Sequence, residues 1–300
     1  MSIGGGGIEI LAVGRRPPQG AAAGLADAWV PADLADPASL RGVCEGADVL
    51  LHLAAALGPD DDHCAAVNVR GTAALMEEAV RAGTGRIVHL STAAVYGPGP
   101  HHGIPVNGVE PVPVSPASRT RLAGETYALA AGATVLRPGL VLGAGDRWVI
   151  PALARLVHAV PALWDGGRGL LSMVAVEDLA RLITLLGVGD AYAGPGGGDP
   201  AIFHASHPQP VRTGELLATL SQHGVLPAVT DALPWDECLR RLKESDCGVS
   251  ERQFSLLAQD HWYESTDAWV AADCPPGPGP LERLKDAADW YRGFLGGGRT

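Results

Sequence analysis

The chain has 300 residues, of which 47% are hydrophobic and 18% charged, and its formal net charge is −11. This length and apolar content suit one large domain, or a nucleotide-binding domain with a smaller partner. The acidic balance argues against nucleic acid or an anionic membrane as a partner, and no apolar run reaches the roughly 18 residues of a membrane span. Residues 1–7 lack a secretory signal, so we expect a cytoplasmic protein whose partner is a small-molecule substrate; a homodimer is compatible with the sequence.

The first half of the chain alternates short apolar strands with helical segments. A β-branched strand at residues 8–13 stops at Gly14, and Trp29 indicates a second, short strand. Further strands are predicted at 48–53, 86–91 and 134–137, and helices at 36–46, 61–82 and 118–131. This alternation predicts an α/β fold, a Rossmann-like doubly wound parallel sheet with right-handed crossovers. Such sheets bind ligands at the carboxyl edge of their strands, where we expect the function.

The pattern loosens after Pro138. It predicts helices at 148–158 and 176–186, Gly-rich stretches at 166–169 and 194–198, a strand at 203–205 and a mostly helical remainder. Tryptophans in that remainder either line a substrate pocket or pack its helices: Trp235, Trp262, Trp269 and Trp290. We expect a nucleotide-binding domain at 1–147, to which 171–205 returns, and a smaller, mostly helical substrate-binding region at 148–170 and 206–300.

Three segments carry a resemblance to a known family. They are residues 90–97 (LSTAAVYG), residues 120–125 (TRLAGE), and residues 136–139 (LRPG) followed by 174–180 (VAVEDLA). Lesser matches are residues 52–55 (HLAA) and 68–72 (NVRGT). In this order and spacing, residues 8–205 resemble the extended short-chain dehydrogenase/reductases, the NAD-dependent epimerase/dehydratase group. The resemblance implies redox chemistry with a dinucleotide cofactor.

The start of the chain departs from the pattern of this family. The family's sheet begins with a strand, a Gly-rich turn and a helix, which together hold the pyrophosphate. Here the strand at 8–13 resembles the family's second strand, and residues 1–7 are too few to supply that unit. Gly4 to Gly7 lack both the strand before the fingerprint and the helix after it. We expect either a displaced start or weak cofactor binding.

The second departure concerns the family's acid, a tyrosine four residues before a lysine on the helix after the Ser/Thr strand. In this chain Arg121 stands at the lysine position and Ala117 at the tyrosine position. Tyr96 belongs to the Val-Tyr-Gly turn, and Tyr127 lies six residues beyond Arg121. Neither tyrosine replaces the missing acid by its spacing.

Candidate cofactor contacts follow from the resemblance. Arginine after the strand at 8–13 accommodates a 2′-phosphate, so we expect NADP(H) rather than NAD(H), unless both arginines are merely solvated. Asp33 and Leu34 resemble an adenine-side contact, with a turn before a helix as the alternative. His52 would border the middle of the cofactor, and is equally a packed, hydrogen-bonded strand residue. The cofactor-binding residues implied are Arg15, Arg16, Asp33, Leu34, His52, Ala54, Ala55 and Pro138.

The candidate catalytic residues are Thr92, Ser118 and Arg121. Thr92 follows a strand of the expected sheet, so its hydroxyl either binds a substrate carbonyl or caps its own turn. Ser118 neighbours the vacant tyrosine position. Arg121 either holds a ribose or carboxylate or pairs with Glu125, and as an arginine it cannot cycle a proton. His101 and His102 lie in an expected loop, where such a pair is either an acid or simply exposed.

No metal site or disulfide is expected. The five cysteines form no Cys-x-x-Cys pair and indicate free thiols in a reducing compartment: Cys44, Cys64, Cys238, Cys247 and Cys274. The run Asp60 to His63 resembles a ligand set, but adjacent residues at a helix start do not converge, and acidic residues suit a helix N-terminus.

Three functions remain open. The leading hypothesis is NADPH-dependent reduction of a ketone on a bulky, polyketide-like secondary metabolite, as in tailoring ketoreductases of antibiotic biosynthesis that also lack the tyrosine. The second is a sugar-nucleotide epimerase or dehydratase, against which Ala117 counts because those reactions begin with a base at the tyrosine position. The third is a non-catalytic binding or regulatory protein that keeps the fold.

Overall fold

The computed structural model describes residues 7–19, 24–192 and 201–297. Contacts divide the chain into two compact units: a first unit of residues 1–95, 113–136 and 183–202, and a second unit of 96–112, 137–182 and 203–300. The domain ranges expected from the sequence stay a prediction. The expected Gly-rich loop at 194–198 lies outside the described residues.

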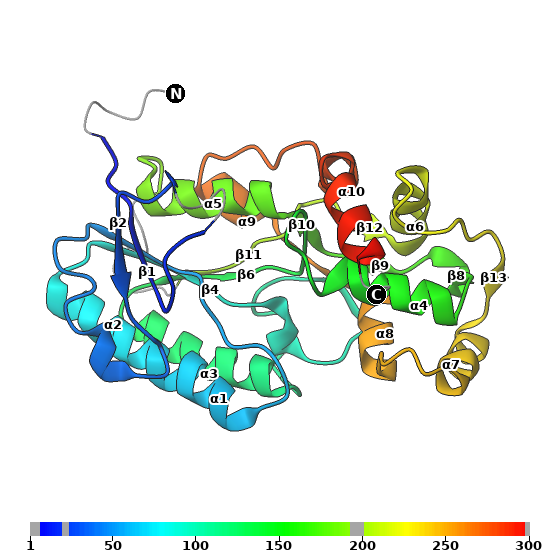
Figure 1. The fold of residues 1–300 in the computed structure, drawn as a ribbon, viewed down its shortest axis with the longest axis horizontal. Helices are drawn as coiled ribbons and strands as arrows, with labels where there is room; N and C mark the ends of the chain where they lie inside the picture. Colours follow the sequence, from blue (N-terminus) through cyan, green and yellow to red (C-terminus); the bar gives the residue numbers. More distant parts are fainter. Residues whose placement is uncertain (1–6, 20–23, 193–200, 298–300) are drawn as a thin grey trace. The chain divides into compact units, whose positions relative to one another are not determined.

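The first unit contains parallel strands in two groups (Figure 1). Strand β1 (Leu11–Gly14) pairs in parallel with β2 (Ala28–Pro31). A four-stranded sheet has the order β11-β6-β4-β3, in which β3 (Val49–His52), β4 (Arg86–Leu90) and β6 (Thr134–Arg137) run parallel. Its fourth strand, β11 (Ile202–His204), reaches the end of the first unit. Each strand falls within or beside a predicted apolar run, and the expected α/β fold with a Rossmann-type parallel sheet is confirmed.

Two helices cover one face of these strands. They are α2 (Thr72–Ala82) and α3 (Pro116–Ala130), preceded by η2 (Pro37–Leu40), α1 (Asp61–Ala65) and the π-helical turn η3 (Ala66–Gly71). Leu75 and Met76 of α2 and Ala128 of α3 bury their side chains in one cluster with Ile87 and Val135 of the sheet. The predicted stop of α2 is confirmed, since Gly83 adopts the left-handed conformation that glycine favours at a helix end.

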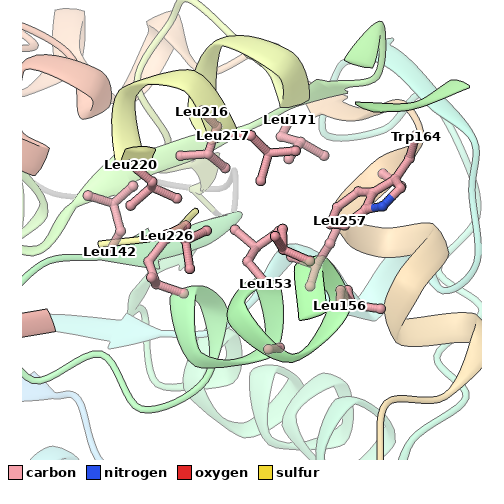
Figure 2. Packing of buried hydrophobic residues seen from close by; sticks show 14 of the residues in the cluster. Leu142, Leu153, Leu156, Trp164, Leu171, Leu216, Leu217, Leu220, Leu226 and Leu257 are labelled. Carbon is pink, nitrogen blue, oxygen red and sulfur yellow. The ribbon is translucent and has the colours of Figure 1, made fainter. Parts of the chain in front are cut away.

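The second unit has its own apolar core. Leu153 and Leu156 of α4 (Val149–Ala159) pack against Leu216 and Leu220 of α6 (Thr213–Gln222), and Trp164 is fully buried among them (Figure 2). The remaining helices are η4 (Ala93–Tyr96), which spans the division between the units, η5 (Asp165–Gly167), α7 (Trp235–Glu244), α8 (Glu251–Ala258), α9 (Thr266–Ala271) and α10 (Pro280–Gly296). A further helix, α5 (Val176–Val188), also crosses the division between the units.

Short strands of the second unit join segments that are distant in the sequence. One sheet has the order β12-β9-β14-β5, formed by β12 (Val211–Arg212), β9 (Leu170–Leu171), β14 (His261–Tyr263) and β5 (His101–Ile104). Two parallel pairs are β10 (Met173–Ala175) with β7 (Leu140–Leu142), and β13 (Ala232–Leu233) with β8 (Leu163–Trp164). The histidine pair expected in a loop therefore lies in a strand. Among the described residues, no helix is long and apolar enough to cross a bilayer.

Candidate functional site

A groove of about 1370 Å³ lies in the first unit. One wall is β1 with the residues around it, 7–15, and the other is β3 with the loop that follows, 48–56. Residues 32–34 after β2, residues 43–47 before β3 and Gly187 near the end of α5 also line it. The groove thus includes the carboxyl ends of β1, β2 and β3. The sequence analysis expects the function at this edge of the sheet.

The groove brings together most of the predicted cofactor residues. Its lining includes Arg15, Asp33, Leu34, His52, Ala54 and Ala55. Arg16 is exposed beside Arg15 but is not part of the lining, and Pro138 belongs to the second unit, where it is buried. Six residues separated by as many as forty positions therefore meet at one surface, as expected of a ligand site at a sheet edge.

The turn after β2 presents Asp33 to the groove. The Asp33 carboxylate accepts the Ala35 N–H through Oδ1 at 2.9 Å, and the Asp33 backbone N–H donates to Ser39 Oγ at 2.9 Å. Leu34 packs against Ala56 and Val67 of the first unit. These contacts hold the turn, and the one made by the carboxylate uses Oδ1.

His52 is a buried, hydrogen-bonded strand residue. Its Nε2 lies 3.1 Å from the Thr72 hydroxyl, and its ring centroid lies 4.9 Å from that of His89 on the neighbouring strand. Burial lowers the pKa of His52 to about 4. Its neutral ring therefore serves the packing of β3 against α2. At neutral pH the His52 side chain adds no charge to the groove that it lines.

Asn68 holds the loop after β3 in place. Its Oδ1 accepts the Ala56 N–H at 2.7 Å, while its Nδ2 donates to the Ala56 carbonyl at 2.9 Å and to Thr120 Oγ1 at 3.0 Å. Asn68 lies in the π-helical turn η3, a deviation that is frequent at functional sites. The sequence analysis gave this residue no role, although the match at residues 68–72 includes it.

The start of α3 has an alanine where the family has its acid. Ala117 packs against the cluster of Ala56, Cys64 and Val67, beside the groove lining. Ser118 is buried and its Oγ belongs to a capping box, donating to the Ser115 carbonyl and lying 2.8 Å from Ser115 Oγ. The proposed catalytic hydroxyl of Ser118 is thus engaged in starting the helix.

Arg121 is directed at the end of β4. Its Nη2 donates to the carbonyls of Leu90, at 2.8 Å, and Ser91. The Ser91 hydroxyl in turn hydrogen-bonds the buried Glu125 carboxylate. Burial lowers the pKa of Arg121 to about 10, so the guanidinium stays charged at neutral pH. Its bonds fix the strand end that leads into Thr92, which is a positioning role.

Thr92 stands at the carboxyl end of β4 and is partly buried. Its Oγ1 accepts the Ala94 N–H at 3.1 Å, which is the turn-capping contact expected as its alternative role. A hydroxyl that accepts one hydrogen bond can still donate its own hydrogen. Thr92 is therefore the candidate catalytic residue that retains a donor for a substrate oxygen.

The two histidines of β5 differ in their surroundings. His101 is buried and its ring packs near Tyr96, His261 and Tyr263 of the second unit. His102 is exposed, with Nδ1 2.8 Å from Asp260 Oδ2. Neither is a loop residue, and both have structural contacts within the second unit.

The described lining fits part of a dinucleotide. Arg15 supplies a guanidinium, the group that accommodates a 2′-phosphate. Asp33 and Leu34 stand where the resemblance implies the adenine side, and Ala54 and Ala55 offer a small apolar wall. A pyrophosphate cradle is not among the described lining residues, because none of them begins a helix. The described residues also contain no cluster of side chains that could hold a metal ion.

Comparison with protein families identifies the chain. Residues 3–190 match the model of the NAD dependent epimerase/dehydratase family, more than half of the chain. The chain belongs to this family. The resemblance drawn from its motifs is thereby confirmed.

Several curated proteins with sequences similar to this chain are named as reductases or dehydrogenases. It is 28% identical over 207 residues to a 4-hydroxy-2-methyl-3-oxo-4-farnesyl-3,4-dihydroquinoline-1-oxide ketoreductase of Stigmatella aurantiaca, covering 66% of this chain and 60% of the relative. It is 36% identical over 138 residues to a 2-alkyl-3-oxoalkanoate reductase of Stenotrophomonas maltophilia, 41% of this chain and 40% of the relative. A 3beta-hydroxysteroid-dehydrogenase/decarboxylase of Arabidopsis thaliana is 29% identical over 168 residues, 51% and 29% of the two chains. The chain spans less than two thirds of each relative.

Solved structures of the same fold bind nicotinamide cofactors. MoeE5 in complex with UDP-glucose and NAD matches with a TM-score of 0.69 at 22% identity, over 96% of this chain and 91% of that one. RMD from Pseudomonas aeruginosa, complexed with NADPH, matches with a TM-score of 0.63 at 20% identity, over 88% and 90% of the two chains. At these identities the similarity establishes the Rossmann fold.

Proposed function

We propose that this family member uses NADPH to reduce a ketone on a bulky, apolar metabolite, without the tyrosine acid of its family. Two features carry the proposal: an apolar Ala117 stands at the position of the family's acid, and Thr92 keeps a hydroxyl at the carboxyl end of β4. Oxidation of a sugar hydroxyl needs a base that removes the hydroxyl proton while the oxidised nicotinamide accepts the hydride, and Ala117 supplies no such base. Thr92 can still donate to a carbonyl oxygen.

The substrate class is supported by the sequence relatives. Each of the three is named for a carbonyl or hydroxyl group on a largely apolar skeleton: a farnesylated quinoline oxide, an alkyl oxoalkanoate and a hydroxysteroid. A polyketide-like ketone of the kind modified in antibiotic biosynthesis falls in this class. MoeE5, whose structure contains UDP-glucose, shares the fold with this chain, but at 22% identity this similarity does not indicate a substrate.

The residues of this chain have separate parts in the proposed reaction. NADPH, when bound, supplies the hydride that reduces the carbonyl carbon. Arg15 would bind its 2′-phosphate and Asp33 would contact its adenine side. Thr92 donates a hydrogen bond to the substrate oxygen, and Arg121 keeps the strand end in position. The proton that completes the alcohol comes from an acidic group of the substrate, such as a phenol beside the ketone.

Two measurements on the purified protein test the proposal. Calorimetric titration with NADPH and NADH comes first, followed by assays of cofactor oxidation with an apolar ketone that has a neighbouring phenol, and with UDP-glucose. Reduction of the ketone, with tighter binding of NADPH, is the expected result. Turnover of UDP-glucose supports the sugar-nucleotide alternative, and binding of neither nucleotide supports a non-catalytic protein.

A further inference from the structure

The guanidinium of Arg121 carries a positive charge that no carboxylate of the described residues contacts. Its Nη2 donates to the carbonyls of Leu90, at 2.8 Å, and Ser91, which are neutral acceptors. The side chain is partly buried, and its Nε is buried without a hydrogen-bond partner. Nη1 makes no hydrogen bond to the described residues either, but unlike Nε it is not buried. Arg121 therefore keeps an accessible, unused donor at the carboxyl end of β4.

Glu125 does not supply the missing counter-charge. It lies one turn further along α3, but its carboxylate hydrogen-bonds the hydroxyl of Ser91, and among the described residues no ion pair joins it to Arg121. Burial lowers the pKa of Arg121 to about 10, although the negative charge of Glu125 acts in the opposite direction. The Arg121–Glu125 pair, one of the alternatives expected from the sequence, is therefore not formed.

Two neutral histidine rings lie beside this cation in the sheet. His89 precedes Leu90 on β4, and its register partner on β3 is His52, with the two ring centroids 4.9 Å apart. Burial lowers the pKa of His52 to about 4 and holds that of His89 well below its usual value, and the charge of Arg121 adds to both shifts. Both ring nitrogens of His89 are buried without a partner. Arg121 is thus surrounded by carbonyl dipoles and neutral rings, with no anion in contact.

A partly buried cation without a counter-ion is an uncommon arrangement in a folded protein. Buried charges are normally paired, because moving a charge out of water costs free energy that a partner or hydrogen bonds must offset. A ligand with a negatively charged oxygen would supply the partner that the chain lacks. The hydroxyls of a ribose are neutral, so the free charge of Arg121 favours an anionic ligand group over the ribose that the resemblance allows.

We propose that Arg121 is the binding site for a phenolate oxygen adjacent to the ketone that Thr92 holds. The inference rests on the proposed function. Thr92 follows Ser91, whose carbonyl Arg121 contacts, so the Thr92 hydroxyl and the free Nη1 belong to the same strand end. An ortho-hydroxyaryl ketone has two oxygens on neighbouring positions and can contact both groups at once. Arg121 thereby selects ketones with an acidic hydroxyl beside the carbonyl.

The charge of Arg121 has a defined place in the reduction. The carbonyl carbon accepts a hydride from NADPH, and the electron pair of the C=O π bond moves to the oxygen. The phenol O–H bond breaks, its proton passes to this oxygen, and the remaining phenolate accepts a charge-assisted hydrogen bond from Nη1. Water returns the proton to the phenolate after release. Arg121 itself neither gains nor loses a proton in these steps.

Absorbance titration tests this inference without turnover, because a phenol and its phenolate absorb at different wavelengths. The probe is ortho-hydroxyacetophenone, titrated from neutral to alkaline pH with the purified protein, alone and with NADP+, which carries no hydride. The methyl ether of the probe has no ionisable oxygen and measures affinity that is independent of the phenolate. Arg121→Gln removes the cation. The matched control is Arg119→Gln, two residues earlier on α3, which removes an exposed ion pair with Asp61.

We expect the pKa of the bound phenol to lie at least one unit below that of the free probe, a tenfold gain in acidity. The shift should disappear in Arg121→Gln and persist in Arg119→Gln. If Arg121→Gln does not fold, the original chain still decides, since an unshifted phenol or no binding of the probe overturns the inference. A shift that survives in Arg121→Gln while NADP+ affinity falls also overturns it, because Arg121 then holds the cofactor.

The same probe separates this inference from the proposed function. A lowered phenol pKa without oxidation of NADPH supports the phenolate site and counts against the ketone reductase. Reduction of the probe by NADPH with an unshifted phenol supports the reductase and overturns the phenolate site.

Discussion

The side chain of Asn68 pairs with the backbone of Ala56 much as a neighbouring strand would. Its Oδ1 accepts the Ala56 N–H at 2.7 Å and its Nδ2 donates to the Ala56 carbonyl at 2.9 Å. Both residues are buried. Because Nδ2 also reaches Thr120 Oγ1, one amide connects the loop after β3 to α3 and fixes the groove wall.

Asn68→Ala should therefore destabilise the protein. It leaves the buried N–H of Ala56 unpaired and its carbonyl with only the weak Cys64 thiol contact at 3.8 Å, and an unsatisfied buried group costs about 1–3 kcal/mol. We expect urea unfolding to show a loss of about 2 kcal/mol or more. The exposed Asn107 provides the matched control, and Asn107→Ala should change the free energy of unfolding by less than about 0.5 kcal/mol. Equal effects of the two substitutions would contradict the role of Asn68.

Gly124 allows α3 to approach η3 closely. A Cβ at this position would lie 2.3 Å from the Asn68 carbonyl oxygen, whereas a Cβ at Gly293 in α10 would meet nothing within 4 Å. Gly124→Ala should cost about 1–3 kcal/mol because the backbones must separate. Gly293→Ala should stabilise by about 0.5–1 kcal/mol, the usual gain from replacing a helical glycine. Calorimetric melting of both variants checks the predicted opposite signs.

The sequence predicts the first unit better than the second for a physical reason. The predicted strand at 134–137 coincides with β6, because a buried parallel strand is a continuous apolar run. β5 was missed because its four residues, among them two histidines, have no such run and depend on pairing His101 with His261. Periodicity within a segment does not reveal a partner 160 residues away.

The same distinction holds at the candidate site. The motif that ends at residue 97 located Thr92, and the spacing to Arg121 located the vacant acid position. The engagement of Ser118 in its own helix cap was readable in the pattern Ser115-Pro116 before a helix, but was not used. The contact of Arg121 with two carbonyls depends on how α3 lies on β4, which only the folded chain defines.

Arg15 and Arg16 should set the preference for NADPH. Replacing the pair by Asp-Ala places a carboxylate where a 2′-phosphate would bind, while a free 2′-hydroxyl can donate to it. Loss of one or two charge-assisted hydrogen bonds, each about 1.5–3 kcal/mol, weakens NADPH binding roughly 10-fold to 1000-fold or more. Titration with both nucleotides measures the change, with the exposed Arg147→Ala as a control. An equal loss for NADH would show that the arginines have another role.

A buried histidine makes the second unit sensitive to acid. His204 Nε2 lies 2.7 Å from the Tyr96 hydroxyl and Nδ1 lies 2.9 Å from the Glu264 carbonyl. Burial lowers the pKa of His204 from 6.5 to about 4. Between these values the unfolded chain binds the proton and the folded chain does not, so stability is complete above about pH 6.5 and declines as the pH falls toward 4.

Substitution of His204 should flatten this pH dependence. His204 contributes up to about 3 kcal/mol of the loss, since one pKa unit corresponds to about 1.4 kcal/mol. His204→Gln keeps polar contacts but does not titrate, so its free energy of unfolding should change less between pH 7 and pH 4.5. Urea unfolding across this range measures the slope, and His158→Gln at an exposed site should retain that of the original chain. A His204→Gln slope equal to the original would refute the assignment.

The last prediction concerns the proton. Ala117 supplies no acid and Arg121, bound to two carbonyls, stays charged, so Thr92 positions the ketone while the substrate protonates its own oxygen. Thr92→Val removes the hydroxyl and should lower kcat about 2-fold to 10-fold, the value of one hydrogen bond. Thr92→Ser keeps the hydroxyl that donates to the substrate and accepts the Ala94 N–H. Its turnover and its free energy of unfolding should therefore both stay close to those of the original chain.

Methylation of the substrate phenol should nearly abolish turnover if that phenol is the acid, because general acid catalysis needs a donor within hydrogen-bond reach of the oxygen. His102→Ala should change the rate little, since the exposed His102 pairs with Asp260 in the second unit. His101 is a poorer choice for this test because it is buried, and its removal would leave a cavity among Tyr96, His261 and Tyr263. A dead His102→Ala variant that accompanies full turnover of the methylated substrate would place the acid on the protein, and the mechanism proposed for Thr92 would be wrong.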